Sequence, residues 1–327
     1  MSRLDPSVAE IRLAVRDSLS DVDDSGGLVL AATSGGADSL ALASATAFIA
    51  PRLGWRAGLL TVDHQLQEGS QERAVAVAQW AASAGLKPAE VLTVRVDGPG
   101  GPEAAAREAR YAALATAAKK LGARVVLLGH TQDDQAETVL LALARGSGPR
   151  GLSGMPATRV IDGVEFARPL LGVSRQTCRD ACAAQGLLPW EDPHNADPAY
   201  ARARVRHEVM PCLSKALGSD VVPNLARTAS MIATDSAYLD SLASVAFGRC
   251  VVDGGLSVAE LAQLPDPLRG RVLHAWALTL GVPGAALSHR HVAALDALVT
   301  AWHGQGPTML PGGVTVERVS GFLRATA

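Results

Sequence analysis

The chain has 327 residues, a formal net charge of −2, and 48% hydrophobic and 19% charged residues. This composition is typical of a folded globular protein with one large or two moderate domains, and it argues against a uniformly basic nucleic-acid binder. No run of eighteen apolar residues and no secretory leader is visible, so we expect a cytoplasmic protein without a membrane partner. The four cysteines form no Cys-x2-Cys pair, which argues against a zinc ribbon or a redox dithiol.

The first predicted strand, Leu28–Thr33, runs into the loop Ser34–Ser39 (SGGADS), and an alanine- and leucine-rich helix follows over Leu40–Ala50. The two glycines let successive backbone N–H groups converge, and the helix N-terminus adds partial positive charge. The two serine hydroxyls can donate to phosphate oxygens, and Asp38 can hold the Mg²⁺ that accompanies a nucleotide. The Walker sequence with its lysine is absent, so this is a different kind of phosphate loop. A plain glycine turn is the alternative interpretation.

Three more apolar runs follow, and helical patterns separate them. The predicted strands are 57–62, 91–96 and 124–129, and the predicted helices between them are 70–84 and 103–121. Strands that alternate with helices predict right-handed βαβ units, a parallel sheet and an α/β fold. Ligands bind at the carboxyl ends of such strands. Because polar residues follow three of the four strands, we predict one composite site.

Asp63 and His64 follow the second strand and can contact a ribose or a purine, or bridge to a metal; helix capping by Asp63 is the alternative. Gly129 and His130 end the fourth strand, before a helix that runs to Ala144 and that Thr131 or Asp133 could cap.

Asp134 and Glu137 are three residues apart in this helix, so we expect both carboxylates on one face, pointing toward the nucleotide loop. Two such carboxylates repel each other unless a cation lies between them. A metal or an ammonium substrate would supply that cation.

Two arginine groups are candidates for RNA contact. Arg107 and Arg110 share a helix face beside Tyr111, where they could bind phosphate or neutralise developing charge. Arg202, Arg204 and Arg206 follow a loop rich in aromatic and turn-forming residues, a mixture that suits RNA. A solvated basic face and an ordinary loop are the respective alternatives.

The C-terminal third has a different character, and we predict a domain boundary between residues 218 and 219, after a break at Pro211. Helices are expected over 224–250, from a Ser257 capping box, over 268–280 and over 288–302. The tail 308–323 contains Pro311-Gly312-Gly313 between β-prone runs and is interpreted as a β-hairpin. His289 and His291 are not expected to bind metal, because no third ligand lies nearby in the sequence.

The ordered motifs resemble one family. The loop Ser34–Ser39 is the PP-loop signature of the N-type ATP pyrophosphatases, which cleave ATP between the α- and β-phosphates. Over about residues 28–210 the further blocks resemble the tRNA(Ile)-lysidine synthase family, in a short form with one small C-terminal domain. These blocks are 63–66, 106–111, 129–138, 145–155, 168–171 and 191–206.

The resemblance implies a PP-loop domain followed by a smaller, mostly helical domain, and a defined reaction. ATP adenylates the C2 oxygen of the wobble cytidine in an isoleucine tRNA with anticodon CAU, and pyrophosphate leaves. The ε-amino group of L-lysine then attacks C2 and displaces AMP, which leaves lysidine. ATP and Mg²⁺ are therefore expected, tRNA and lysine are the expected partners, and a homodimer is an open alternative to a monomer.

The resemblance also assigns residues to roles. Asp38, Asp134, Glu137 and Arg110 are expected to be catalytic, and Asp38 to hold Mg²⁺ through the ATP phosphates. Asp134 and Glu137 are expected to bind lysine. Arg107, Arg110, Arg202, Arg204 and Arg206 are expected to bind tRNA. The residues expected to bind ATP are Thr33, Ser34, Gly35, Gly36, Ala37, Asp38, Ser39, Asp63, His64, Gly129 and His130.

Gln67, His194 and Ala203 depart from the family pattern, which usually has Arg, Ser and Asn there. Two rival functions are also compatible with the phosphate loop: another PP-loop ligase, either tRNA-modifying or amide-forming, and a non-catalytic module that senses ATP. A thiolation enzyme would normally need Cys-x2-Cys pairs. A sensing module has no need of the carboxylate pair or the arginine-rich segment.

Overall fold

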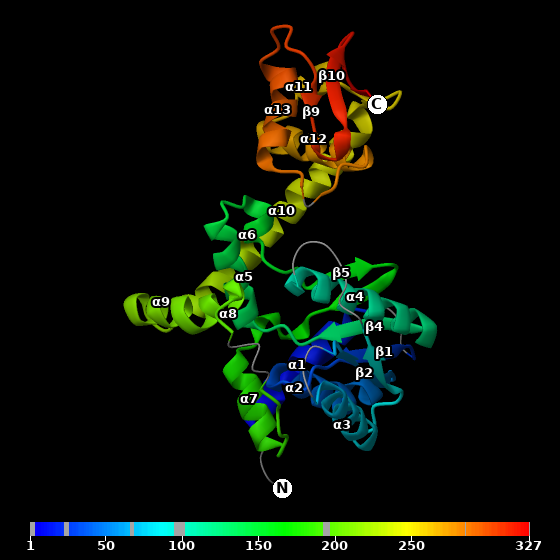
Figure 1. Cartoon of the computed structure of the whole chain (residues 1–327), viewed down its shortest axis with the longest axis vertical. Coiled ribbons are helices and arrows are strands. Elements are labelled where there is room, and N and C mark those ends of the chain that lie inside the picture. Colours follow the sequence, from blue (N-terminus) through cyan, green and yellow to red (C-terminus); the bar gives the residue numbers. More distant parts are fainter. Residues whose placement is uncertain are drawn as a thin grey trace. The chain divides into compact units, whose positions relative to one another are not determined.

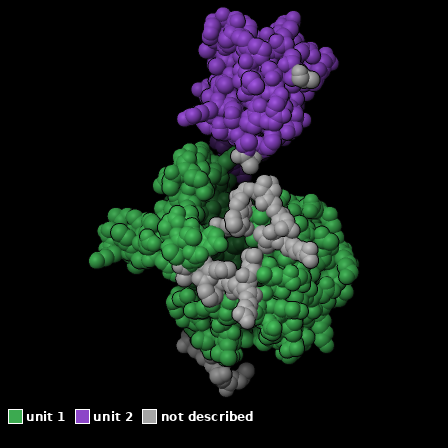
Figure 2. Space-filling view, in the orientation of Figure 1, with its two compact units in different colours: residues 1–233 green, residues 234–327 purple. Residues whose placement is uncertain are grey.

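The computed structural model forms two compact units, residues 1–233 and 234–327, which are coloured separately in Figure 2. Each unit has its own hydrophobic core. Among the helices described, none is long and apolar enough to cross a membrane. The structure describes residues 4–22, 26–65, 69–94, 102–191, 197–284 and 286–326, with the side chains of 102–104 left out.

The first unit is built on a six-stranded sheet in the order β3-β2-β1-β4-β6-β5. All neighbouring strands are parallel except β5 and β6, which pair antiparallel at one edge. This arrangement confirms the predicted α/β fold. The strands are β1 (Leu28–Ala32), β2 (Arg56–Asp63), β3 (Ala89–Thr93), β4 (Ala123–Leu128), β5 (Thr158–Ile161) and β6 (Val164–Ala167).

Helices cover both faces of this sheet, because alternate side chains of a strand point to opposite faces (Figure 1). Val29 and Ala31 of β1 belong to a core with α1, α2, α3 and α7, whereas Leu28 and Leu30 belong to a core with α4. The helices of this unit are α1 (Pro6–Ser20), α2 (Ala37–Ile49), η1 (Ala50–Leu53), α3 (Ser70–Ser83), α4 (Pro102–Leu121), α5 (Gln132–Ala144), α6 (Pro149–Leu152), η2 (Pro169–Gly172) and α7 (Arg175–Ala184).

The segment after residue 200 is one continuous helical run, and Pro211 does not break it. The run consists of α8 (Ala201–Arg204), a π-helical turn η4 (Val205–Val209) and α9 (Met210–Leu217). The Met210 N–H donates to the Val205 carbonyl, five residues back. Such a wider turn changes the hydrogen-bond partners just before Pro211, which has no N–H to donate, so the helix passes the proline. The expected break was wrong for this reason.

The second unit combines helices with a five-stranded antiparallel sheet in the order β7-β8-β11-β10-β9. β9 and β10 pair across Pro311–Gly313 as predicted, and β10 and β11 form a second hairpin with its turn at Ser320 and Gly321. The helices are α10 (Val221–Cys250), α11 (Val258–Ala262), α12 (Asp266–Thr279) and α13 (His289–Thr300), and the strands are β7 (Val251–Val252), β8 (Gly255–Ser257), β9 (Thr308–Met309), β10 (Thr315–Val319) and β11 (Phe322–Thr326). Helix α10 begins in the first unit and ends in the second. The boundary at 218/219 stays a prediction.

Candidate active site

The phosphate loop between β1 and α2 is curled as its glycines allow. Gly35 has φ +89°, a conformation that an L-residue avoids, and Gly36 is the N-cap of α2. Ser39 Oγ accepts from the Ser34 N–H at 3.1 Å and donates to the Gly36 carbonyl at 3.0 Å. These bonds fix the loop over the first turn of a thirteen-residue helix. The result is a built anion site at a helix N-terminus.

Gly129 brings the end of β4 against this same helix terminus. A Cβ at Gly129 would lie 3.0 Å from the backbone N and Cα of Ser39, so a side chain there would push the two elements apart. The next residue, His130, lines the cavity, and burial together with the Arg110 guanidinium lowers its pKa to about 3. The imidazole is therefore neutral near pH 7 and can offer a lone pair or one N–H to a ligand.

A cavity of about 1000 Å³ opens at the carboxyl ends of the strands, as the sequence predicted. It gathers most of the predicted nucleotide-binding residues and also Arg110 and Arg206. Gly35, Arg107, Arg202, Arg204, Asp134 and Glu137 do not line it. The predicted residues on its wall are Thr33, Ser34, Gly36, Ala37, Asp38, Ser39, Asp63, His64, Gly129 and His130.

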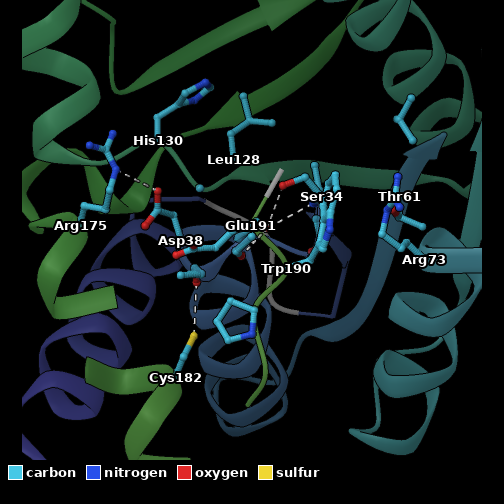
Figure 3. A pocket seen from close by; sticks show the side chains of 18 of the residues that line it. Ser34, Asp38, Thr61, Arg73, Leu128, His130, Arg175, Cys182, Trp190 and Glu191 are labelled. Carbon is cyan, nitrogen blue, oxygen red and sulfur yellow. Dashed lines mark hydrogen bonds and ion pairs between the residues drawn. The ribbon is translucent and has the colours of Figure 1, made fainter. Parts of the chain in front are cut away.

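Asp38 lies in the first turn of α2 with a largely buried carboxylate. Its Oδ2 is 3.7 Å from Arg175 Nε, the contact drawn in Figure 3, and its Oδ1 has no hydrogen-bond partner among the described residues. Burial raises the pKa of Asp38 to about 6, although Arg175 opposes this effect. A buried carboxylate oxygen that lacks a partner fits a cation ligand. Within the described residues no three His, Cys, Asp or Glu side chains cluster to hold a metal, so Mg²⁺ here would need the ATP phosphates as further ligands.

Asp134 and Glu137 lie on one face of α5, as predicted, and Arg175 supplies a cation between them. Arg175 Nη2 is 2.9 Å from Asp134 Oδ1 and 3.2 Å from Glu137 Oε1. The other Asp134 oxygen accepts from the N–H and hydroxyl of Thr131, at 2.9 and 3.0 Å, in a capping box. Burial would raise the pKa of Asp134, but Arg175, this N–H and Arg206 together lower it. Asp134 is therefore ionised at neutral pH.

Arg206 closes the same pair from the opposite side. Its Nε is 2.8 Å from Glu137 Oε1, and its Nη2 is 3.0 Å from Asp134 Oδ1 and 3.1 Å from Glu137 Oε2. Arg202 adds a longer contact, with Nε 3.8 Å from Glu137 Oε2, and donates to the Thr138 hydroxyl. Protein arginines thus provide the charge for which the sequence argument required a metal or an ammonium group. The expectation that a metal or an ammonium group is needed between these two carboxylates was wrong, because it took only the residues of one helix into account.

These contacts also change the interpretation of the three C-terminal arginines of this unit. Arg206 and Arg202 direct guanidinium groups at buried carboxylates, not at solvent. Arg204 is exposed and donates to the carbonyls of Pro198 and Ala199. Of the three, Arg204 has the geometry for a phosphate contact, since nothing described neutralises its charge.

Arg107 and Arg110 lie on one face of α4 as predicted, and Tyr111 joins them to a third arginine. The Tyr111 hydroxyl accepts from Arg107 at 3.4 Å and from the buried Arg168 at 3.3 Å. Burial raises the pKa of Tyr111, but the surrounding guanidinium groups outweigh it and lower the pKa. Burial lowers the pKa of Arg110, whose Nε has no hydrogen-bond partner among the described residues. This cluster is strongly electropositive and is suited to an anionic ligand.

The side chain of Asp63 is engaged within its own loop. Its Oδ1 accepts from the Gln65 N–H at 2.9 Å and from the Ser70 hydroxyl at 2.6 Å. These bonds tie the end of β2 to the start of α3, which resembles the helix-capping role given above as the alternative for Asp63. Nucleotide binding at Asp63 and His64 stays a prediction.

The remaining residues singled out in the sequence lie elsewhere. Ser288 and His291 form a capping box at α13, and Ala203 is buried. Gln67 and His194 lie outside the described residues.

Sequence reasoning missed four side chains that shape the site: Arg175, Arg168, Arg73 and Trp190. Arg175 is the first residue of α7 and lies 38 to 42 positions from Asp133, Asp134 and Glu137, yet its backbone N–H also donates to Asp133 Oδ2 at 2.8 Å. No local pattern links these segments. The only signal was the chemistry itself, since a buried acid pair implies a basic partner somewhere in the chain.

Comparisons with known proteins agree with this architecture. Residues 10–213 match the model of the PP-loop domain family, and residues 256–324 match that of the TilS substrate binding domain. A tRNA(Ile)-lysidine synthase from Salinispora tropica is 64% identical over 327 residues, covering 99% of this chain and 98% of the relative. One from Streptomyces coelicolor is 52% identical, covering 97% of each chain.

Among solved structures, the U34-tRNA thiolase NcsA from Methanococcus maripaludis aligns with a TM-score of 0.58 at 17% identity, covering 70% of this chain and 80% of that one. At that identity the likeness shows a shared fold alone. Because the two lysidine synthases are 64% and 52% identical over nearly the whole length of both chains, this chain belongs to the tRNA(Ile)-lysidine synthase family.

Proposed function

We propose that this chain is an ATP-dependent ligase that joins L-lysine to C2 of the wobble cytidine in tRNA(Ile) with anticodon CAU. The supporting observation is a single arginine that connects two parts of one site. Arg175 contacts Asp38 beside the phosphate loop and also Asp134 and Glu137 on α5. The phosphate loop suits the nucleotide half of the reaction, and the acid pair suits an amino-acid cation. Arg175 lines the cavity and so links the nucleotide site to the acid pair, which does not itself line the cavity.

In the first half-reaction, the phosphate loop and the N-terminus of α2 hold the ATP phosphates. The cytidine O2 attacks the α-phosphorus, and pyrophosphate leaves. Mg²⁺, held by Asp38 and the phosphates, would offset the charge of the leaving group. Arg110, from the electropositive cluster on α4, faces the cavity and is proposed to stabilise charge on the phosphoryl oxygens or to hold the RNA.

In the second half-reaction, the ε-amino group of lysine attacks C2 and AMP leaves with the C–O bond electrons. The amine must lose its protons to become the nucleophile and the product. We assign lysine binding to Asp134 and Glu137, with one change from the sequence-based view. Because Arg175 and Arg206 already contact three of the four carboxylate oxygens, a lysine ammonium group must share or replace an arginine contact.

Product assays with and without each substrate test the assignment and its rivals. We expect pyrophosphate release to require the tRNA and AMP release to require both tRNA and lysine. A tRNA with uridine at the wobble position should support neither. Pyrophosphate release without tRNA would favour an amide-forming ligase, and ATP binding with no turnover under any condition would favour a sensing module. A cytoplasmic location is part of this proposal, because the proposed substrate is a tRNA, and a homodimer stays a prediction that sedimentation can test.

A further inference from the structure

Arg73 and Trp190 form a stacked pair on the wall of the cavity (Figure 3). The guanidinium carbon of Arg73 lies 4.1 Å from the centroid of the Trp190 ring. Arg73 belongs to α3, whereas Trp190 lies beyond the end of α7, so the fold brings together two residues that are far apart in sequence. We call this pair the Arg–Trp clasp.

Trp190 is attached to the phosphate loop. Its backbone N–H donates to the Gly35 carbonyl at 2.9 Å, at the residue where the loop turns with positive φ. Its own carbonyl lies 3.8 Å from the position of a Cβ on Gly36. The ring of Trp190 is therefore fixed beside the loop that is proposed to hold phosphates.

Arg73 belongs to α3, the helix that follows the strand ending at Asp63. It lies one turn after Ser70, whose hydroxyl donates to Asp63 Oδ1, so its helix is fixed to the end of β2. Stacking uses the flat face of a guanidinium group and leaves its in-plane N–H groups directed outward. Arg175 and Arg206 also line the cavity, and their N–H groups contact carboxylates of the acid cluster.

The charge of the phosphate loop shows why such an arginine is needed. The loop SGGADS contains no lysine and carries the acidic Asp38, so it offers backbone and hydroxyl donors but no positive side chain. A Walker loop supplies a lysine to the β- and γ-phosphates. Here a basic side chain must come from another element, and Arg73 lies on the cavity wall with its guanidinium oriented by Trp190.

We propose that the Arg–Trp clasp is part of the ATP site. Arg73 binds phosphate oxygens of the nucleotide, and Trp190 positions Arg73 and forms the wall beside the phosphate loop. This inference rests on the proposed use of ATP, and it adds two binding residues from outside the PP-loop signature.

Equilibrium binding of ATP and of adenosine, without tRNA or lysine, tests the clasp. We expect Arg73→Gln to weaken ATP binding by about ten- to hundredfold, as befits a lost charge-assisted contact, and to leave adenosine binding unchanged. Trp190→Phe keeps an aromatic ring, should weaken ATP binding less, and should remove most of the change in tryptophan fluorescence on ATP binding. Arg52→Gln is the matched control, because Arg52 stacks on Phe48 in the same way outside the cavity.

Each outcome decides the proposal. Unchanged ATP affinity in Arg73→Gln, with a wild-type chain that binds ATP, would overturn the clasp and leave the proposed function standing. An equal loss of ATP and adenosine binding would show a packing role and would overturn the phosphate contact. A wild-type chain that binds no ATP would overturn the proposed function itself. Thermal unfolding of each variant beside Arg52→Gln verifies that the fold is intact.

Discussion

Replacing Asp38 by asparagine should stabilise the fold while it removes activity. The pKa of Asp38 is about 6, against an ordinary value of 3.8, because the folded chain buries the carboxylate. Each pKa unit corresponds to about 1.4 kcal/mol, so ionised Asp38 costs the folded state about 3 kcal/mol. This is an upper limit, because the side chain is 24% exposed.

The sign follows from the direction of the pKa change. A carboxyl group whose pKa is raised by folding carries no penalty below pH 4, where it is protonated in both states. The penalty grows between about pH 4 and pH 6, where the unfolded state is ionised and the folded state still holds the proton, and it is complete above pH 6. The groups that act on Asp38 are Arg175 and Arg206, which favour its ionised form, and Asp133 and Asp134, which oppose it. Asp38→Asn should therefore match the wild type in stability near pH 4 and exceed it at pH 7.5.

Denaturant unfolding at pH 4.5 and 7.5 measures this difference, with tryptophan fluorescence reporting on both units, because three tryptophans lie in the first unit and two in the second. We expect a gain of about 1–3 kcal/mol at pH 7.5 that falls to about a third of that value at pH 4.5. Asp17→Asn, at a largely exposed position on α1, is the control and should change stability little at either pH. In parallel, Mg²⁺ with ATP should stabilise the wild type, by about 2.7 kcal/mol at a hundredfold excess over Kd, but stabilise the variant far less.

Pyrophosphate release by Asp38→Asn should fall below detection, because the carboxylate that we propose as a Mg²⁺ ligand is lost. A variant less stable than the wild type at pH 7.5 would refute the reasoning, since attraction by Arg175 would then outweigh burial. Normal pyrophosphate release from a folded variant would remove Asp38 from the reaction.

Three further variants test other parts of the site. Glu137→Gln should raise the lysine KM about ten- to hundredfold, because a charge-assisted contact of about 1.5–3 kcal/mol is lost, while single-turnover pyrophosphate release persists. If both half-reactions fail and the lysine KM is unchanged, Asp134 and Glu137 form a metal or ATP site. Arg204→Ala should reduce the slope of log tRNA affinity against log salt concentration by about 0.7–0.9, whereas Arg206→Ala should leave this slope unchanged. Equal slopes for the two variants would contradict the different surroundings of these arginines. Gly129→Ala should raise the ATP KM at least about tenfold and destabilise the first unit by about 1–3 kcal/mol in thermal unfolding, because its Cβ would lie 3.0 Å from the Ser39 backbone. A variant with unchanged ATP KM and unchanged stability would show that β4 and α2 can separate freely.

The sequence predicted what depends on local patterns. Four strands of the first sheet, the helices between them and the curled phosphate loop follow from apolar periodicity and from glycine at the turn. Strands β5 and β6 were not predicted, because each is only four residues long and β5 is mostly exposed at a sheet edge. The path of the chain at Pro211 depends on a π-helical turn that no composition rule signals.

The acid cluster shows why the remaining site residues needed the fold. From one helix, Asp134 and Glu137 look like a pair that needs an external cation, but the fold surrounds them with arginines from α7, α8 and η4. Asp38 and Asp133 also contact Arg175, so the full cluster holds four carboxylates against three guanidinium groups. When Asp38 is ionised, the cluster therefore lacks one positive charge. Burial raises the pKa of Asp38, and Asp134 and Asp133 add to this effect, while Arg175 and Arg206 oppose it. We infer that Mg²⁺ would supply the missing charge beside Asp38. Lysine binding at Asp134 and Glu137 stays a prediction, because arginines already contact this pair.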